Sequence, residues 1–239
     1  MDRKDVNEKL SYFIRPLSFP VAVKLLDPED EVPEKAKVPS RDLGHKLMAC
    51  QAMAMARRHG RTVAIGPQDN PCAPSAVGLG FVDPDTVDRP PGFEAEGGKE
   101  LPFGKYAHLL YAPLHSAAFE PDILVVYGNS AQVMRLVQAF SLGGKHVETV
   151  ATAFVDCVDI AFVKESPAPC MILPSGGDRV FGTTQDFEMI FALPWSQMEE
   201  CMGGLEMSHK MGFRYPVVSY LNYEAKLPPF LDLEQWKKK

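Results

Sequence analysis

The chain has 239 residues and a formal net charge of −6 at pH 7, with 46% hydrophobic and 23% charged residues. This length and composition are typical of a globular protein with one large domain or two small ones. The acidic balance argues against nucleic acid as the main partner, because phosphate binding needs a basic face. The N-terminus MDRKDVNEKLSYF carries charges where a signal peptide needs an apolar stretch, and no run reaches the roughly 18 apolar residues of a membrane helix. We therefore expect a cytoplasmic protein with no membrane partner.

Helical and strand-like patterns alternate in the first part of the chain. Apolar residues at helical spacing predict a helix over 2–14, and the apolar, β-branched run FPVAVKLL (19–26) predicts a buried strand. Residues 27–40 are rich in proline and charge, which indicates an exposed loop. A second helix is expected over 41–60, ended by its last residue, Gly60, and a short strand over 61–67.

The second part of the chain continues the alternation after a long loop. The further expected elements are the loop 82–104, a strand at 105–114, a strand–turn–helix unit at 121–144, a strand at 169–173 followed by a turn at 174–179, and a strand at 187–194 followed by a helix. Ser130 is a candidate cap for the helix of the 121–144 unit, and Ser196 with Glu199 reads as a capping box for the last helix. The alternation predicts a single mixed α/β domain over 1–239, with a mixed β-sheet flanked by helices.

Several common catalytic motifs are missing. The sequence has no GxGxxG after a strand, no GxxxxGK[ST], no GxSxG and no HExxH, and its six histidines are scattered. Dinucleotide binding, P-loop chemistry, a nucleophile elbow and a histidine-based zinc site therefore have no local support. Whether the protein is an enzyme stays open.

The cysteines are more informative. There are five, an odd number, and no two form CxxC, so a disulfide framework, a zinc knuckle and a thioredoxin motif are not indicated. Cys201 in the last predicted helix reads as a small core residue. Cys72, in DNPCAPSAVGLGF, differs because it lies in a proline-rich turn before a short predicted helix, whose N-terminus favours thiolate. Since thiolate ligands of iron–sulfur clusters can come from distant segments, the missing CxxC spacing does not exclude a cluster.

Four polar residues suggest a different kind of site. Lys24 interrupts an apolar strand, so it either extends from a sheet edge to solvent or points into a site. Asn129 and Ser130 follow a strand at the start of a helix, where ligands of α/β sheets tend to bind, and Arg179 ends the turn PSGGDR, which is either an anion-binding nest or a hairpin. These residues predict, as an alternative, a metal-free module that binds a small acidic ligand.

The order of these segments resembles a known family. FPVAVKLL, the cysteine-bearing helix ending in ARRHG, PCAPSAVGLGF, PDILVVYGNSAQVMRLVQAF and PSGGDRVFGTTQDFEMIFALPW together resemble domain-of-unknown-function family 169, over about residues 10–215. The resemblance implies a single cytoplasmic domain of bacteria and archaea with no assigned function. It also implies cysteines at the positions of Cys50 and Cys72, with Cys157 matching a third. The Cys-x-Gly-Ala pattern often found in the family is replaced here by Cys-Ala-Pro-Ser at 72–75.

If Cys50, Cys72 and Cys157 converge, three thiolates would hold a four-iron, four-sulfur cluster with one position open to another ligand. Three readings remain at this point: a cluster-binding redox protein or accessory factor, the metal-free binding module, and a structural partner protein with inert cysteines. The partners expected are a small-molecule ligand or a redox partner protein, with a homo-oligomer as a further alternative.

Overall fold

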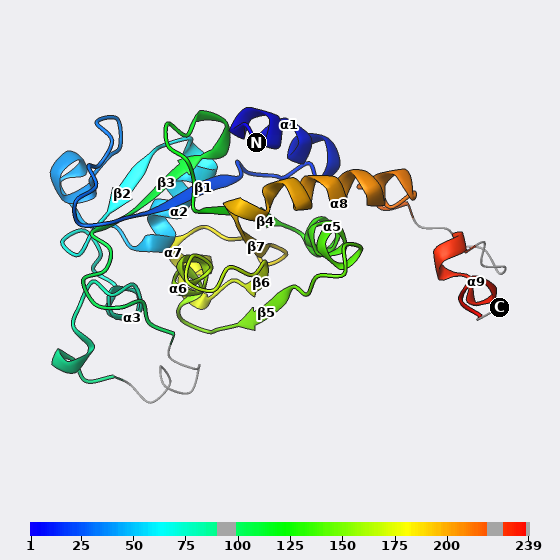
Figure 1. The fold of residues 1–239 in the computed structure, drawn as a ribbon. Coiled ribbons are helices and arrows are strands. Elements are labelled where there is room, and N and C mark those ends of the chain that lie inside the picture. Colours follow the sequence, from blue (N-terminus) through cyan, green and yellow to red (C-terminus); the bar gives the residue numbers. More distant parts are fainter. Residues whose placement is uncertain (90–98, 219–226, 238–239) are drawn as a thin grey trace.

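The computed structural model describes residues 1–89, 99–218 and 227–237, and its centre is a seven-stranded sheet (Figure 1). The strands are β1 (Val21–Leu26), β2 (Val63–Ile65), β3 (His108–Pro113), β4 (Ile123–Gly128), β5 (Glu148–Ala151), β6 (Cys170–Leu173) and β7 (Met189–Pro194). Their order in the sheet is β2-β3-β1-β4-β7-β6-β5. The pairs are antiparallel except β5 with β6, which are parallel. The mixed sheet expected from the sequence is thus confirmed.

Helices cover both faces of the sheet. They are α1 (Arg3–Phe13), α2 (Ala49–His59), α3 (Ala73–Gly78), α5 (Ser130–Ser141), α6 (Asp156–Phe162), α7 (Gly176–Phe181), α8 (Met198–Lys210) and α9 (Leu233–Trp236). Single helical turns lie at Pro39–Leu43, Pro84–Thr86, Leu114–Ser116, Trp195–Gln197 and Pro229–Leu231. None of the helices in the described ranges is long and apolar enough to cross a membrane.

Alternate strand residues point to opposite layers, because the side chains of a strand repeat every two residues. Val21 and Val23 of β1 belong to a core shared with α2, α3 and α6, whereas Ala22 packs in a second core with α1, α5 and α8. Both layers keep these strands out of water, which explains why β1, β4 and β7 read as continuous apolar runs.

Most expected elements occur, but several boundaries were wrong. The helix expected over 41–60 begins only at Ala49, because the preceding segment forms the turn Pro39–Leu43 and then a left-handed residue, Gly44 (φ 73°). Its end is as expected, with Gly60 in the left-handed conformation (φ 69°). In the long loop expected at 82–104, residues 84–86 form a helical turn, and 90–98 lie outside the described residues.

Three expected turns and caps also differ. Asn129, not Ser130, caps α5, because the Asn129 side chain accepts a hydrogen bond from the backbone N–H of Gln132. The segment 174–179 is neither a hairpin nor a nest, since it enters the short helix α7. The capping box expected at 196–199 does not form, because a separate helical turn occupies 195–197 and α8 begins after it without a side-chain cap.

Candidate functional site: a three-cysteine pocket

Cys50, Cys72 and Cys157 line the same pocket, although they are up to 107 positions apart in the sequence. The cavity measures about 140 Å³. At roughly 30 Å³ per water molecule it has room for a few waters or a small inorganic group. Pockets for drug-sized organic ligands are larger, on the order of 300–1,000 Å³. The three cysteines are half-buried, whereas Cys170 and Cys201 are fully buried elsewhere.

Each of the three cysteines lies at the first turn of a helix. Cys50 is the second residue of α2, Cys72 is the N-cap of α3, and Cys157 is the second residue of α6. The first backbone N–H groups of a helix have no intrahelical acceptor, so they favour negative charge beside them. The N-terminal turn of α7 borders the same pocket through Ser175 and Asp178.

Asn70 and Ser75 fix the proline-rich turn around Cys72. The backbone N–H of Cys72 donates to Asn70 Oδ1 over 3.1 Å, and Asn70 Nδ2 donates to Ser75 Oγ over 2.9 Å. The Cys157 thiol donates to the same Ser75 oxygen over 3.4 Å. Asn70 thus closes a local turn onto the backbone two residues later. These bonds connect the α3 cysteine to the α6 cysteine through one serine.

Two buried aspartates face the thiols. Asp156 Oδ2 accepts from the backbone N–H of Ser175 over 2.8 Å, and Asp178 Oδ2 accepts from the Thr184 hydroxyl over 2.7 Å and from the Tyr127 hydroxyl over 3.0 Å. Asp178 Oδ1 is buried and has no partner among the described residues. Burial raises the pKa of Asp156 to about 7, and the neighbouring Asp178 adds to the shift.

Burial and the neighbouring aspartates favour the neutral form of two of the three thiols, those of Cys50 and Cys157. Burial raises the pKa of Cys50 to about 12, and the charges of Asp178 and Asp156 contribute in the same direction. Burial also raises the pKa of Cys157 well above its ordinary value. Neutral thiols are poor nucleophiles, so these two cysteines are not activated for covalent catalysis.

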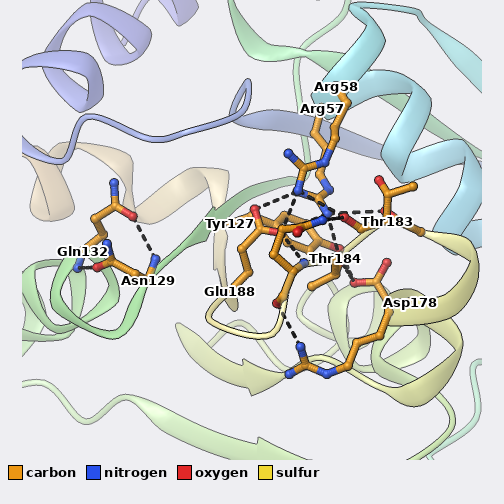
Figure 2. A network of polar contacts seen from close by, with 12 residues as sticks. Arg57, Arg58, Tyr127, Asn129, Gln132, Asp178, Thr183, Thr184 and Glu188 are labelled. Carbon is orange, nitrogen blue, oxygen red and sulfur yellow. Dashed lines mark hydrogen bonds and ion pairs between the residues drawn. The ribbon is translucent and has the colours of Figure 1, made fainter.

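Asp178 of the pocket belongs to a buried polar network, which Figure 2 shows. Arg57 is two helical turns beyond Cys50 on the same face of α2, about 10 Å along the axis. Its Nη1 donates to Glu188 Oε1 over 3.0 Å and its Nη2 donates to the Thr184 hydroxyl over 2.8 Å. The guanidinium carbon lies 3.9 Å from the centre of the Tyr127 ring. Because Tyr127 and Thr184 both donate to Asp178, this network holds one wall of the cysteine pocket.

The four ligand candidates of the alternative reading lie outside the cysteine pocket. Lys24 Nζ donates to the carbonyl of Glu120 over 3.4 Å, and Arg179 Nη1 donates to the carbonyl of Gln185 over 2.9 Å. Asn129 caps α5, and Ser130 is the exposed first residue of that helix. The contacts of Lys24, Asn129 and Arg179 are thus ordinary structural ones, on three separate elements.

Sequence reasoning missed the acidic side of the site. Asp156 and Asp178 carry no motif, and α6, which brings Cys157 into the pocket, was not expected as a helix. Asp156 directly precedes Cys157 in the sequence, but this adjacency gains significance only once the fold places both residues in the same pocket. Within the ranges that the structure describes, no three Cys, His, Asp or Glu side chains are grouped so that they could hold one metal ion.

Comparisons with known proteins identify the family. The model of domain-of-unknown-function family 169, described as an uncharacterised ArCR family, matches residues 9–204. An uncharacterised protein of Methanocaldococcus jannaschii is 30% identical to the chain over 213 residues, which cover 78% of this chain and 86% of the relative. No solved structure matches the chain. With its family match spanning most of its length, the chain belongs to domain-of-unknown-function family 169.

Proposed function

We propose that Cys50, Cys72 and Cys157 are thiolate ligands of an iron–sulfur cluster, of the four-iron, four-sulfur type. The observation that carries the proposal is the shared pocket, which collects three thiols from three helices. Thiolates select zinc, copper(I) and iron–sulfur clusters over hard cations. A cluster supplies electron transfer or, at an iron without a cysteine ligand, a site for a substrate.

The chemistry of the pocket favours an electropositive inorganic group over an organic anion. Its described lining includes Asp156 and Asp178 and no lysine, arginine or histidine. Such a lining repels an acidic ligand, whereas a cationic iron–sulfur core neutralises the thiolates that form around it. The positions of Cys50, Cys72 and Cys157 at the starts of α2, α3 and α6 would favour the negative charge of the thiolates that hold the cluster.

We propose a cluster and not a single ion as the bound group. The described side chains do not gather in threes around a point that one ion could occupy. A cluster distributes its ligands over several iron atoms, so its thiolates need not converge on one point. Three thiolates would leave one iron without a cysteine, and Asp156 and Asp178 are the carboxylates in the described lining of the same pocket.

Under this proposal the protein has a redox role, either in electron transfer or as an accessory factor of another enzyme. Its partner would be a small molecule bound at the open iron or a redox partner protein. The five free cysteines fit a reducing compartment, which keeps the expected cytoplasmic location. For the metal-free acidic-ligand module, no contact of Lys24, Ser130 or Arg179 adds support.

The test is anaerobic purification and reconstitution, followed by iron and sulfide analysis and visible absorption. We expect brown protein with iron and sulfide in near-equal amounts. Replacement of Cys50, Cys72 or Cys157 by serine should remove most of the iron, whereas Cys170→Ser and Cys201→Ser should not, since both lie buried outside the pocket. Colourless protein without iron after reconstitution, or equal iron loss in the two control variants, would overturn the proposal.

A further inference from the structure

Arg57 and Arg135 are both fully buried, but their surroundings differ. Arg57 forms an ion pair with Glu188. Among the described residues Arg135 has no carboxylate within ion-pair distance, and its guanidinium donates one hydrogen bond, from Nη1 to Gln138 Oε1 over 3.0 Å. Its Nε and Nη2 are buried without a partner. An uncompensated buried charge is costly, so a buried arginine without an acid indicates a missing anion.

The neighbours of Arg135 are basic as well. Arg135 lies on α5, which packs beside α8 (Figure 1), and α8 ends in a turn at Gly212 (φ 97°) that carries the chain on to Arg214. Burial lowers the pKa of Arg135. The pKa of His209 is lowered by partial burial and by the charges of Arg214 and Arg135, and its Nδ1 is buried without a partner. Both arginines thus lie close enough to His209 to affect its pKa, and in the described part of the chain no acidic group shifts the pKa of His209 in the opposite direction.

Arg135 and Arg214 line a cavity of about 530 Å³, within the usual range of small-molecule pockets. The rest of its wall is mostly apolar, with Met134, Phe213 and Val217. This combination of guanidinium groups and apolar surface suits a ligand with one anionic end and one apolar end, because guanidinium binds carboxylate and phosphate with paired hydrogen bonds.

We propose that the cavity between α5 and the segment after α8 binds a small organic anion, a carboxylate or a phosphate ester, through Arg135 and Arg214. The anion provides the missing counter-charge of Arg135, and the apolar wall covers the rest of the ligand. The site belongs to the α1–α5–α8 layer, on the opposite face of the sheet from the cysteine pocket. It is therefore independent of the proposed iron–sulfur cluster.

The test compares thermal unfolding of the full chain in hexanoate, phenyl phosphate and the neutral analogue hexanamide, at constant ionic strength. Hexanoate and phenyl phosphate separate the two anion types. We expect at least one of them to raise the unfolding midpoint in proportion to the logarithm of its concentration, and hexanamide to have no such effect. Arg135→Met and Arg214→Gln should each weaken the anion at least about 10-fold by calorimetric titration.

Arg41→Gln is the control, since it removes an exposed arginine that is paired with Asp42 and belongs to neither site, and it should leave anion affinity unchanged. Without anion, Arg135→Met should be at least as stable as the wild type, because it removes an uncompensated charge. Three results would refute the site: no anion-specific stabilisation of the wild type, an unchanged affinity in Arg214→Gln, or a loss of stability in anion-free Arg135→Met, which would show that Arg135 is paired within the chain.

Discussion

Replacement of Glu188 by alanine should destabilise the protein severely. The side chains of Glu188 and Arg57 are 1% and 0% exposed, and Arg58 shares the same carboxylate over 2.7 Å. Glu188→Ala leaves the Arg57 charge buried without an acid, and it also removes the acceptor of the Gln185 backbone N–H. Breaking a buried pair from one side typically costs about 3–5 kcal/mol.

The same protein offers an exposed pair for comparison. Lys9 and Glu206 lie 2.7 Å apart, with side chains 39% and 41% exposed. Glu206→Ala should therefore cost about 0–1 kcal/mol, because water and salt screen exposed pairs. In a chain of this size, about 3–5 kcal/mol corresponds to a fall of about 6–20 °C in the unfolding midpoint.

Urea unfolding of both variants measures the two losses directly, provided that the dependence of the unfolding free energy on urea stays unchanged. A double variant with Arg57→Met should lose less than the two single variants together, since the second change removes the charge that the first left unpaired. If Glu188→Ala lowered the free energy of unfolding no more than Glu206→Ala, the buried ion pair would not stabilise the protein as we expect.

Three further predictions concern other parts of the fold. Gly203→Ala should raise the free energy of unfolding by about 0.5–1 kcal/mol, whereas its neighbour Gly204→Ala should lower it, because the added Cβ would lie 2.0 Å from a backbone oxygen of α5; urea unfolding measures both. The pKa of Glu165 is lowered by its bonds to Lys105 and a tyrosine, so its stabilisation is present above the ordinary pKa of a glutamate and is lost as the pH falls through the lowered value. Glu165→Gln should therefore be less stable than the wild type near pH 7, and the difference should shrink as the pH falls through the lowered pKa of Glu165, as pH-dependent urea unfolding would show. Asn70→Ala should lower the free energy of unfolding by about 1–2 kcal/mol, because it removes the two hydrogen bonds that hold the turn before α3. It should also reduce the iron content after reconstitution; an unchanged iron content would show that this turn is not needed for cluster binding.

Local sequence patterns predicted the central strands and the ends of helices well. The apolar runs at 19–26 and 187–194 became β1 and β7, both buried on two faces, where continuous hydrophobicity is the expected signature. Gly60 ends α2 because a left-handed residue closes the helix, a requirement that the sequence itself displays. The start of α2 was less readable, since its N-cap, Met48, is not one of the usual capping residues.

The elements that the sequence analysis missed are short or half-exposed. β5 is an edge strand of four residues with alternating partial burial, so it lacks an apolar run. α6 spans seven residues, too few for helical periodicity to stand out, and its stability comes from packing between α3 and the sheet. The segment between the predicted helix ending near 144 and the strand at 169 therefore looked featureless.

The grouping of Cys50, Cys72 and Cys157 in one pocket depends on β5 and α6, the elements that the sequence did not predict. Cys157 reaches the pocket only because α6 lies on the same side of the sheet as α2 and α3, and α6 belongs to the connection between β5 and β6. A parallel strand pair requires its connection to cross one face of the sheet. The choice of face is set by packing over the whole domain, so no local pattern around Cys157 encodes it. The three cysteines of the candidate site can thus be picked out from the sequence, but their convergence, and the two aspartates that join them, depend on a crossover that only the folded sheet determines.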